Sequence, residues 1–245
     1  MAGPVTGDEG AGQQYFTLPV GLNVQNTDGS TQSFVACYVL HLGSPSAQGT
    51  LPFESLGIQK GQARQLSSGE NISSQLGSYC NSAGFPTGHD LAPQPNYAPD
   101  DISASRYQDD RSGAAQVIRS YYNAVNRSEY VRAYSYWEPA AASQQLASLD
   151  AFSKGYADTQ SVKLTTGKET SSSGAGQVYQ TVPVTLVAQT RSGQTQTFVG
   201  CYTLHLSNPQ IQGVPPFQPM GITNAKLQKV ENNANTGNLM ASACQ

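Results

Sequence analysis

Charged side chains are scarce in this chain of 245 residues. They make up 12% of the sequence, the formal net charge is -3, and Lys and Arg form no run. Proteins that bind nucleic acids need basic patches, so we expect no nucleic-acid partner. Solubility must instead rest on neutral polar side chains, a composition that is common among exported proteins.

Long apolar segments are missing as well. No stretch approaches the roughly 20 apolar residues of a transmembrane helix, so we expect no transmembrane segment. The first residues, MAGPVTGDEG, have neither a basic start nor an apolar core. We therefore expect no signal sequence within this chain.

Motifs of common catalytic sites are also lacking. There is no GxSxG elbow and no P-loop, and GAGQ precedes a predicted strand where a dinucleotide loop would follow one. The strands predicted between Ser161 and Ser207 contain no Asp or Glu except Glu169, at a strand end. We therefore expect no catalytic residues, no cofactor and no metal.

An internal repeat is the strongest positive signal. Residues 10–60 recur at 174–224 with a constant offset of 164 and no gap, and 27 of the 51 positions are identical. The shared sequences are GAGQxYxTxPVxLxxQ, FVxCYxLHL and PxxQGxxPFxxxGI. The chain therefore contains two copies of one unit, which also fits its length. We expect a first unit over 1–80 and a second over 109–245.

The four cysteines follow the same offset. Cys37 and Cys80 correspond to Cys201 and Cys244. Four cysteines permit three connectivities, and the duplication favours one disulfide within each unit, Cys37 with Cys80 and Cys201 with Cys244. Zinc is the alternative, but CxxC and HxxxH spacings are absent and a four-ligand site would have to straddle both units. Disulfides predict an oxidising compartment, so the protein is expected to be secreted, periplasmic or at the cell surface.

The second unit begins with helical periodicity. Asp109 and Asp110 stand where a helix N-terminus favours negative charge. Apolar spacing then predicts three helices, over 114–127, 129–137 and 148–157, with Pro139 ending the second. Asp150 and Asp158 flank the third helix, where capping and solvent exposure are the expected roles.

From about residue 160 the period changes to two. This predicts a series of strands, over 161–168, 178–190, 195–207 and 217–230. A glycine and serine loop is expected at 171–176. Pro19 and Pro183 occupy equivalent strand positions, which indicates a bulge or an unpaired edge there.

The first unit lacks the helices. Its repeat begins almost at Met1, which leaves a half copy made only of sheet, with an exposed apolar face. Such faces are rare in monomers. Three coverings compete: chain upstream of Met1, which is the plainest, the second unit, or another chain. Between the units, 81–108 is expected to be a linker or a surface-hugging extension, stiffened by its prolines, Pro86, Pro93, Pro95 and Pro99.

The second unit resembles the nuclear transport factor 2-like (SnoaL-like) superfamily. The resemblance rests on VIRSYYNAVNRSEYVRAYSYW at 117–137, FSKGYADT at 152–159, and the GAGQVYQTVPVTL and FVGCYTLHL strands. It is closest to uncharacterised exported bacterial members and covers about 109–230, but the first unit only through its strands. It implies an α+β fold, the cystatin-like cone, in which a curved antiparallel sheet follows three helices.

The resemblance also implies a pocket inside the cone of the second unit, with a small apolar ligand as a candidate. Its lining candidates are Tyr134, Trp137, Phe152, Tyr156, Tyr202 and Leu204. The competing interpretation is that aromatic residues at helical spacing form the core.

Enzymes of this superfamily use an Asp or His base with a Tyr or protonated acid as hydrogen-bond donor. The polar candidates here are His205 and its counterpart His41. Strand alternation places His205 opposite Tyr202, so a pocket lined by Tyr202 excludes it. A structural role is favoured, because His41 belongs to a unit without a closed cone.

We expect an exported, non-catalytic binding or assembly protein of the cell envelope or extracellular space. It would consist of tandem nuclear transport factor 2-like units and bind a protein partner, or self-associate, through the exposed sheet of the first unit. The alternative is a SnoaL-like small-molecule binder or enzyme with Tyr134, Tyr156 and His205 as polar groups. A third hypothesis is a subunit that polymerises by covering that sheet with a neighbour's helices.

Overall fold

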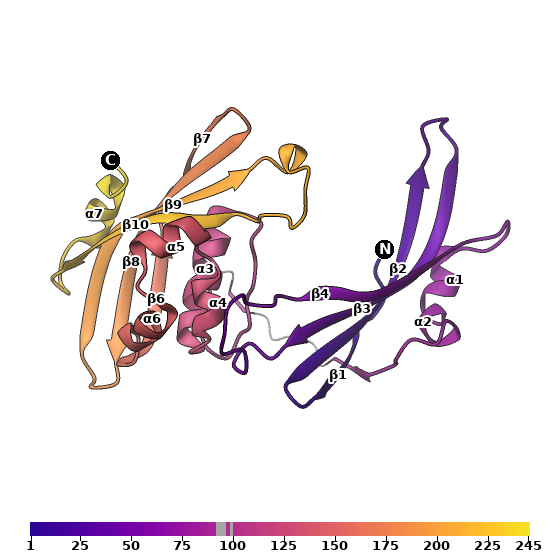
Figure 1. Ribbon diagram of the computed structural model, residues 1–245, viewed down its shortest axis with the longest axis horizontal. Coiled ribbons are helices and arrows are strands. Elements are labelled where there is room, and N and C mark those ends of the chain that lie inside the picture. Colours follow the sequence, from indigo (N-terminus) through magenta and orange to yellow (C-terminus); the bar gives the residue numbers. More distant parts are fainter. Residues whose placement is uncertain (92–96, 99) are drawn as a thin grey trace. The chain divides into compact units, whose positions relative to one another are not determined.

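The computed structural model describes residues 1–91, 97–98 and 100–245. The chain forms two compact units, each built on an antiparallel sheet (Figure 1). Unit 1 comprises Met1–Gln48 and Glu54–Pro95, and the body of unit 2 is Asn96–Gln245. The predicted α+β class is confirmed. Three of the prolines expected to stiffen the linker, Pro93, Pro95 and Pro99, lie outside the described residues.

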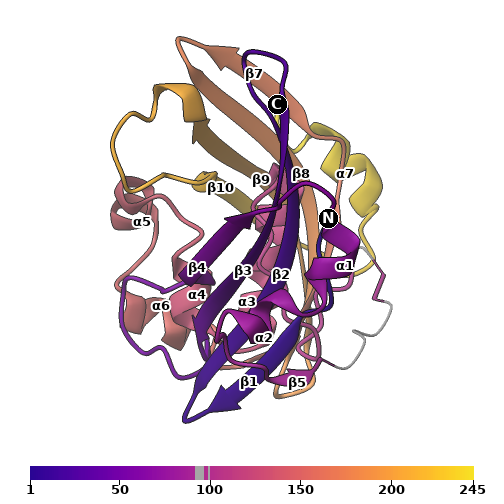
Figure 2. The same ribbon diagram turned by 90° about the vertical axis from the view of Figure 1, so that its right-hand side faces the viewer.

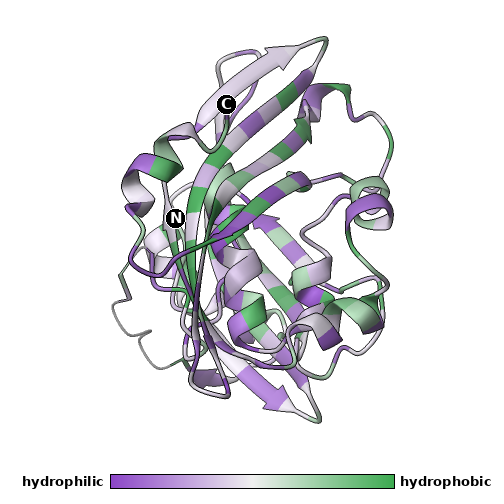
Figure 3. Cartoon of the chain, turned by 90° about the vertical axis from the view of Figure 1, so that its left-hand side faces the viewer, coloured by the Kyte–Doolittle hydropathy of each residue, from purple (hydrophilic) through white to green (hydrophobic). Residues whose placement is uncertain are grey.

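The sheet of unit 2 has the order β10-β9-β8-β6, and β7 also pairs with β8. Its strands are β6 (Thr159–Thr166), β7 (Thr170–Gly174), β8 (Gln177–Thr190), β9 (Thr195–Ser207) and β10 (Gly221–Val230). Hydrophobic and hydrophilic bands alternate along its long strands (Figure 3), because successive side chains point to opposite faces. The loop predicted at 171–176 is wrong, since β7 occupies most of it. All five β7 residues are exposed and none is apolar, so no alternation indicated a strand.

The helices of unit 2 include the three predicted ones, at slightly different bounds. They are α3 (Ala114–Asn126), α4 (Tyr130–Tyr134), α5 (Pro139–Gln145), α6 (Leu149–Gly155) and α7 (Thr236–Ser242), with a 3-10 turn η1 (Pro209–Ile211). The α5 helix was not predicted. Pro139 was expected only to end a helix, but it opens this one, at a position where its missing N–H costs nothing.

Asp109 and Asp110 precede α3, as expected, but neither lies in its first turn. Gly113 is the N-cap residue. Asp109 instead accepts a hydrogen bond from the Tyr136 hydroxyl at 2.7 Å, and Asp110 accepts one from the Ser112 N–H at 2.9 Å. Asp150 does lie in the first turn of α6, where it pairs with Lys154.

A buried ionic network fixes α4 against α3. The side chains of Arg132 and Glu129 are 0% and 1% exposed, and their Nε and Oε2 atoms are 2.6 Å apart. Arg132 also donates to the Asn123 Oδ1 at 2.9 Å and to the Gln108 carbonyl at 2.6 Å. Removing one partner of such a pair typically costs about 3–5 kcal/mol, because the other charge is left buried and unpaired.

The same network attaches the segment that precedes α3. The Asn123 amide donates to the carbonyls of Ser103 and Arg106 at 2.9 and 2.8 Å. Ile102 is buried in the core of unit 2. Residues 100–108 therefore hug the surface of unit 2, one of the two arrangements expected for this segment.

The sheet of unit 1 has the order β4-β3-β2-β1-β5. Its strands are β1 (Thr6–Gly10), β2 (Gln13–Gln25), β3 (Thr31–Gly43), β4 (Gly57–Gln65) and β5 (His89–Asp90). The expectation of a sheet-only unit is wrong. Two short helices, α1 (Ile72–Leu76) and α2 (Tyr79–Ser82), lie together on one side of the sheet (Figures 1 and 2). They are too short to show a helical apolar period, and the Asn71 side chain caps the first of them.

The long hairpin has the same register in both units. Tyr15 pairs with His41 and Pro19 with Cys37, and the equivalent residues of unit 2 pair in the same way. The outer strand carries a bulge at the same position, at Gln59 in β4 and Thr223 in β10. Both hairpins of the GAGQ sequence turn through an alanine and a glycine with positive φ, as the hairpin interpretation of that sequence requires.

The two strand prolines lie where one partner strand ends and the next begins. Along β8, pairing with β6 ends at Val184 and pairing with β7 begins at Thr181, so Pro183 falls in the gap. Pro19 falls in the equivalent gap of β2, after β1 has paired as far as Thr17. The expected unpaired edge is present only in part, because the carbonyls of Pro19 and Pro183 accept hydrogen bonds from the N–H groups of Gly3 and Gly167. Proline's missing N–H is tolerated there.

Both predicted disulfides are formed. Cys37 is bonded to Cys80 and Cys201 to Cys244, each pair 43 residues apart, with Cα–Cα distances of 5.3 and 5.1 Å. They tie the helical tail of each unit to its sheet and indicate an oxidising environment. Within the part of the chain that the structure describes, no helix is long and apolar enough to cross a membrane.

Removing one disulfide is expected to destabilise its own unit. We expect a Cys201→Ala/Cys244→Ala variant to lower the free energy of unfolding by about 2–4 kcal/mol, because its unfolded chain is less constrained. Urea unfolding monitored by fluorescence of Trp137, the single tryptophan, reports on unit 2. The matched control, Cys37→Ala/Cys80→Ala, should shift that transition much less; equal shifts would contradict the assignment of each bond to its own unit.

Candidate functional site

The six pocket-lining candidates of unit 2 come together in one aromatic cluster. Tyr202, Leu204, Trp137 and Phe152 are buried in the core, with Tyr134 and Tyr156 packed against it. Phe152 contacts both outer rings, with centroids 5.4 Å from Tyr134 and 5.2 Å from Tyr156. These side chains pack against one another between α3, α4, α6 and the sheet.

Tyrosine hydroxyls pair at the centre of this cluster. Tyr121 and Tyr156 are joined by a hydrogen bond of 2.8 Å, and Tyr122 and Tyr202 by one of 2.6 Å. Burial raises the pKa of all four phenols above the ordinary value. The four phenols are therefore neutral at physiological pH, and their hydroxyls are hydrogen-bonded in pairs. None of these hydrogen bonds is to a group that could act as a general base.

His205 lies on the other face of the sheet from Tyr202, as strand alternation predicted. Its Nδ1 is 2.6 Å from Glu138 Oε1 and its Nε2 is 2.5 Å from Gln177 Oε1. The ring stacks on Tyr179, with centroids 4.7 Å apart. Glu138 immediately precedes α5, so the imidazole connects the start of this helix to the hairpin.

His41 occupies the equivalent place in unit 1. Its Nε2 is 2.5 Å from Gln13 Oε1, and its ring lies 4.9 Å from that of Tyr15. The histidine, glutamine and tyrosine thus recur as a set in both hairpins. The contacts to glutamine and tyrosine are common to both units, whereas the contact to a carboxylate, Glu138, is found only at His205. The shared contacts favour a structural role for both histidines.

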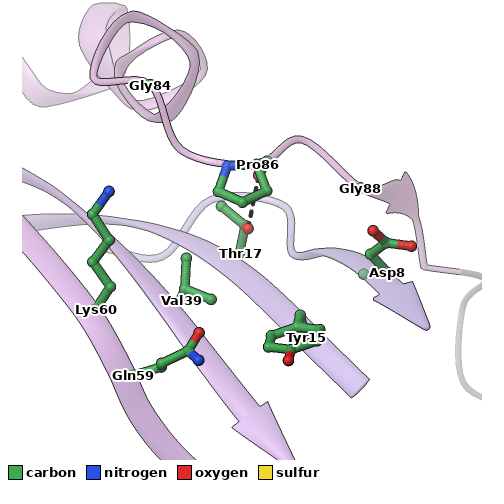
Figure 4. A pocket seen from close by; sticks show the side chains of 10 residues that line it. Asp8, Tyr15, Thr17, Val39, Gln59, Lys60, Gly84, Pro86 and Gly88 are labelled. Carbon is green, nitrogen blue, oxygen red and sulfur yellow. Dashed lines mark hydrogen bonds between the residues drawn. The ribbon is translucent and has the colours of Figure 1, made fainter. Parts of the chain in front are cut away.

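A cavity of about 370 Å³ lies in unit 1, between the sheet and residues 84–88 (Figure 4). The Thr17 hydroxyl donates to the Pro86 carbonyl at 2.8 Å across its floor. Figure 4 shows Lys60 and Asp8 at opposite ends. The Lys60 ammonium lies 4.5 Å from the centroid of the Phe85 ring, and Asp8 belongs to the edge of β1.

Sequence reasoning did not find this cavity. Its lining comes from β1 to β4 and from the segment after α2, and the only polar side chains it gathers are common surface types. The separated ammonium and carboxylate could hold a small zwitterion, but they form no nucleophile and base pair. A second cavity, of about 570 Å³, lies in unit 2 between Ala98, residues 100–104 and β6.

The face of unit 1 opposite its helices is apolar and open. We call it the open face and define it by eight side chains, Phe16, Leu18, Val20, Leu22, Phe34, Tyr38, Leu40 and Ile58. Leu22 is 39% exposed and Ile58 is 68% exposed, and the other six are partly buried. Cys37 and its disulfide lie on the other face, where Ile72 of α1 packs on Gly21. The exposed apolar face predicted for the first unit is therefore present.

The equivalent face of unit 2 is the core of that unit. Leu186 and Ile222, the counterparts of Leu22 and Ile58, are 4% and 0% exposed. Five of the other counterparts belong to the same core or pack against it, namely Val182, Val184, Phe198, Tyr202 and Leu204. The sixth is Gln180, which stands in place of Phe16. The same face thus has two environments in one chain. In unit 2 it is covered by α3, α4, α6 and residues 136–138, and in unit 1 neither helix covers it.

No protein-family model, curated protein or solved structure matches this chain. Among the described residues, no group of three or more His, Cys, Asp or Glu side chains could hold a metal ion. The site must therefore be interpreted from its own geometry.

The buried tyrosines predict a loss of stability at high pH. Because their pKa is higher in the folded than in the unfolded state, they stabilise the fold fully below pH 10 and lose this contribution as the pH rises above it. At pH 11 each such phenol should cost about 1.4 kcal/mol.

We expect a Tyr122→Phe/Tyr202→Phe variant, which removes one hydroxyl pair together, to lose about 2.7 kcal/mol less stability than the wild type between pH 9 and 11. Urea unfolding at each pH, monitored by Trp137, measures the difference. Phenolate absorbance that shows all 13 tyrosines of the native protein titrating near pH 10 would contradict the burial described above.

Proposed function

We propose that this is an exported, non-catalytic binding or assembly protein that holds another polypeptide on the open face of unit 1. The observation that carries the proposal is the open face itself. Seven of its eight side chains have counterparts in unit 2 that belong to the core of that unit or pack against it, yet Leu22 and Ile58 are exposed. Contiguous apolar surface of this kind marks interaction sites in soluble proteins.

The fold proposed for both units is the nuclear transport factor 2-like cone, complete in unit 2. The order of elements supports it, because α3, α4 and α6 precede a curved antiparallel sheet whose concave side they cover. In unit 1 the hairpin and its outer strand repeat this sheet with the same register and bulge. The proposed location is the cell envelope or the extracellular space, and the two disulfides support it.

The proposed absence of catalysis follows from how polar groups are used. The hydroxyls inside unit 2 bond to one another, and His205 is held between Glu138 and Gln177 on the opposite face. A general base must lie within hydrogen-bond distance of the proton that it removes. His205 and the tyrosine hydroxyls lie on opposite faces of the sheet, so one substrate could not contact both.

The alternative function is a SnoaL-like small-molecule binder or enzyme that uses the cone of unit 2. Its support is the group of tyrosine hydroxyls, Tyr121, Tyr122, Tyr156 and Tyr202, which are the type of donor such a site needs. Binding there requires the aromatic cluster to move apart. The open face of unit 1 needs no such rearrangement, so binding of a polypeptide is the better-supported function.

Photocrosslinking tests the proposed function. A benzoylphenylalanine placed at Leu22 or at Ile58 in the full chain should crosslink one and the same polypeptide in the envelope or extracellular fraction of the producing cells. Ile211, which is 56% exposed in unit 2, is the control position. Unlabelled wild-type protein should compete with the crosslink, and an Ile58→Asp variant should not.

The Ile58→Asp change should leave folding intact because the side chain is already exposed, whereas Ile222→Asp at the equivalent buried position should destabilise unit 2. Crosslinks of equal yield and identity at Ile211, or none from either open-face position, would refute the proposed function.

A further inference from the structure

The chemistry of the partner follows from a comparison of the two units. Resting on the proposed function, we propose that the open face of unit 1 binds an amphipathic helix of the α3 type, supplied by another polypeptide. Unit 2 shows such an interaction within the chain, because α3 lies on its equivalent sheet face, packed on β6 and β8, while α4, α6 and residues 136–138 cover the rest of that face.

The apolar stripe of α3 defines what the face accepts. Five consecutive stripe positions are at most 4% exposed, namely Val117, Ile118, Tyr121, Tyr122 and Val125. Tyr121 lies with its centroid 6.4 Å from that of Tyr202, and Tyr122 is hydrogen-bonded to the Tyr202 hydroxyl. The partner helix should therefore carry apolar or tyrosine side chains at positions i, i+1, i+4, i+5 and i+8.

The open face has the groups that this stripe contacts. Tyr38 is the counterpart of Tyr202, whose hydroxyl is hydrogen-bonded to that of Tyr122. Leu40, Val20 and Ile58 are the counterparts of buried core residues of unit 2. One difference makes the open face more apolar. Gln180, whose Oε1 is buried without a hydrogen-bond partner in unit 2, is replaced by Phe16.

The distribution of charged side chains around the open face also indicates an apolar partner. None of the eight open-face side chains is charged, and among the described residues the one acidic neighbour on this side, Glu9 of β1, is bonded to Gln14 at one end of the hairpin. The basic side chains of β4, Lys60 and Arg64, lie on the opposite face, where they contact Phe85 and Glu70. A partner whose contact surface carried charges would lose their hydration without gaining an ion pair. The contact stripe of the partner is therefore uncharged.

The helix must come from another polypeptide. In the described part of the chain, α3 is the one helix of eight residues or more, and it is already buried in unit 2. The helices α1 and α2 are tied to the opposite face of unit 1 by the Cys37–Cys80 bond. No other helix of the described residues is long enough to cover the hairpin.

The test uses a peptide copied from α3. The peptide covers residues 112–128 and carries a fluorescein label. Gln116→Glu and Ser120→Lys are joined as a lactam on the side opposite the stripe, because an isolated helix of this length is only marginally stable without such a link. The control peptide has the same lactam and also Ile118→Glu and Tyr122→Glu. Fluorescence polarisation is measured with the full-length protein and with its Leu22→Asp/Ile58→Asp variant.

We expect saturable binding of the stripe peptide, at least tenfold weaker binding of the control peptide, and at least tenfold weaker binding to the variant protein. Trp137 fluorescence should stay unchanged, which shows that the peptide does not exchange into unit 2. Equal binding to wild type and variant, equal binding of both peptides, or a change at Trp137 that accompanies binding would overturn the inference.

Failure of the helix inference is distinguishable from failure of the proposed function. No binding of the peptide together with a specific crosslink from Leu22 and Ile58 would leave a polypeptide partner that is not a helix. No peptide binding and no specific crosslink would refute both.

Discussion

The constraint on which this structure depends is that the apolar face of its long curved hairpin must be covered. The strands of each hairpin are 13 or 14 residues long, and because successive side chains point to opposite sides, each hairpin presents two faces. One face carries the cysteine and is closed by the disulfide-linked tail in both units. The other face is closed only in unit 2, by α3, α4 and α6 and by residues 136–138. The difference between a completed core and a binding surface is therefore the presence of these covering helices.

The covering of unit 2 is held by more than apolar contact. Arg132 and Glu129 form a buried pair that also bonds to Asn123 of α3 and to the segment before it. Such a pair contributes little net stability, but it is costly to break and it specifies one arrangement of its partners. We infer that this pair holds α3 and α4 on the sheet. In the part that the structure describes, unit 1 has no equivalent of the pair and no equivalents of α3 and α4.

Much of the fold could be predicted from the sequence because the signals are periodic. The stripe of α3, the alternation of FVGCYTLHL and the duplicated cysteine spacing each extend over several turns or pairs, and the structure follows all three. The short helices α1, α2 and α7 could not be predicted, because each spans less than two helical turns and therefore shows no repeated apolar spacing. The β7 strand was missed because serine has no apolar side chain to alternate.

The candidate site was only partly visible from the sequence. The exposed apolar face of unit 1 followed from the missing helices, but the cavity at Lys60 draws on five separate segments and left no linear pattern. The Arg132–Glu129 pair was hidden for another reason. Two opposite charges three residues apart on a short helix usually indicate a solvated surface, and only the tertiary structure shows that this pair is buried.

The central claim is that the same sheet face is solvent-accessible in unit 1 and enclosed in unit 2. The most direct test is the paramagnetic relaxation that a soluble gadolinium chelate causes at the methyl groups of the full-length protein. The account predicts strong broadening at Leu22 and Ile58 and little at their counterparts Leu186 and Ile222, which are 4% and 0% exposed. Equal protection of both sets would contradict it, because it would show that the face of unit 1 is already covered.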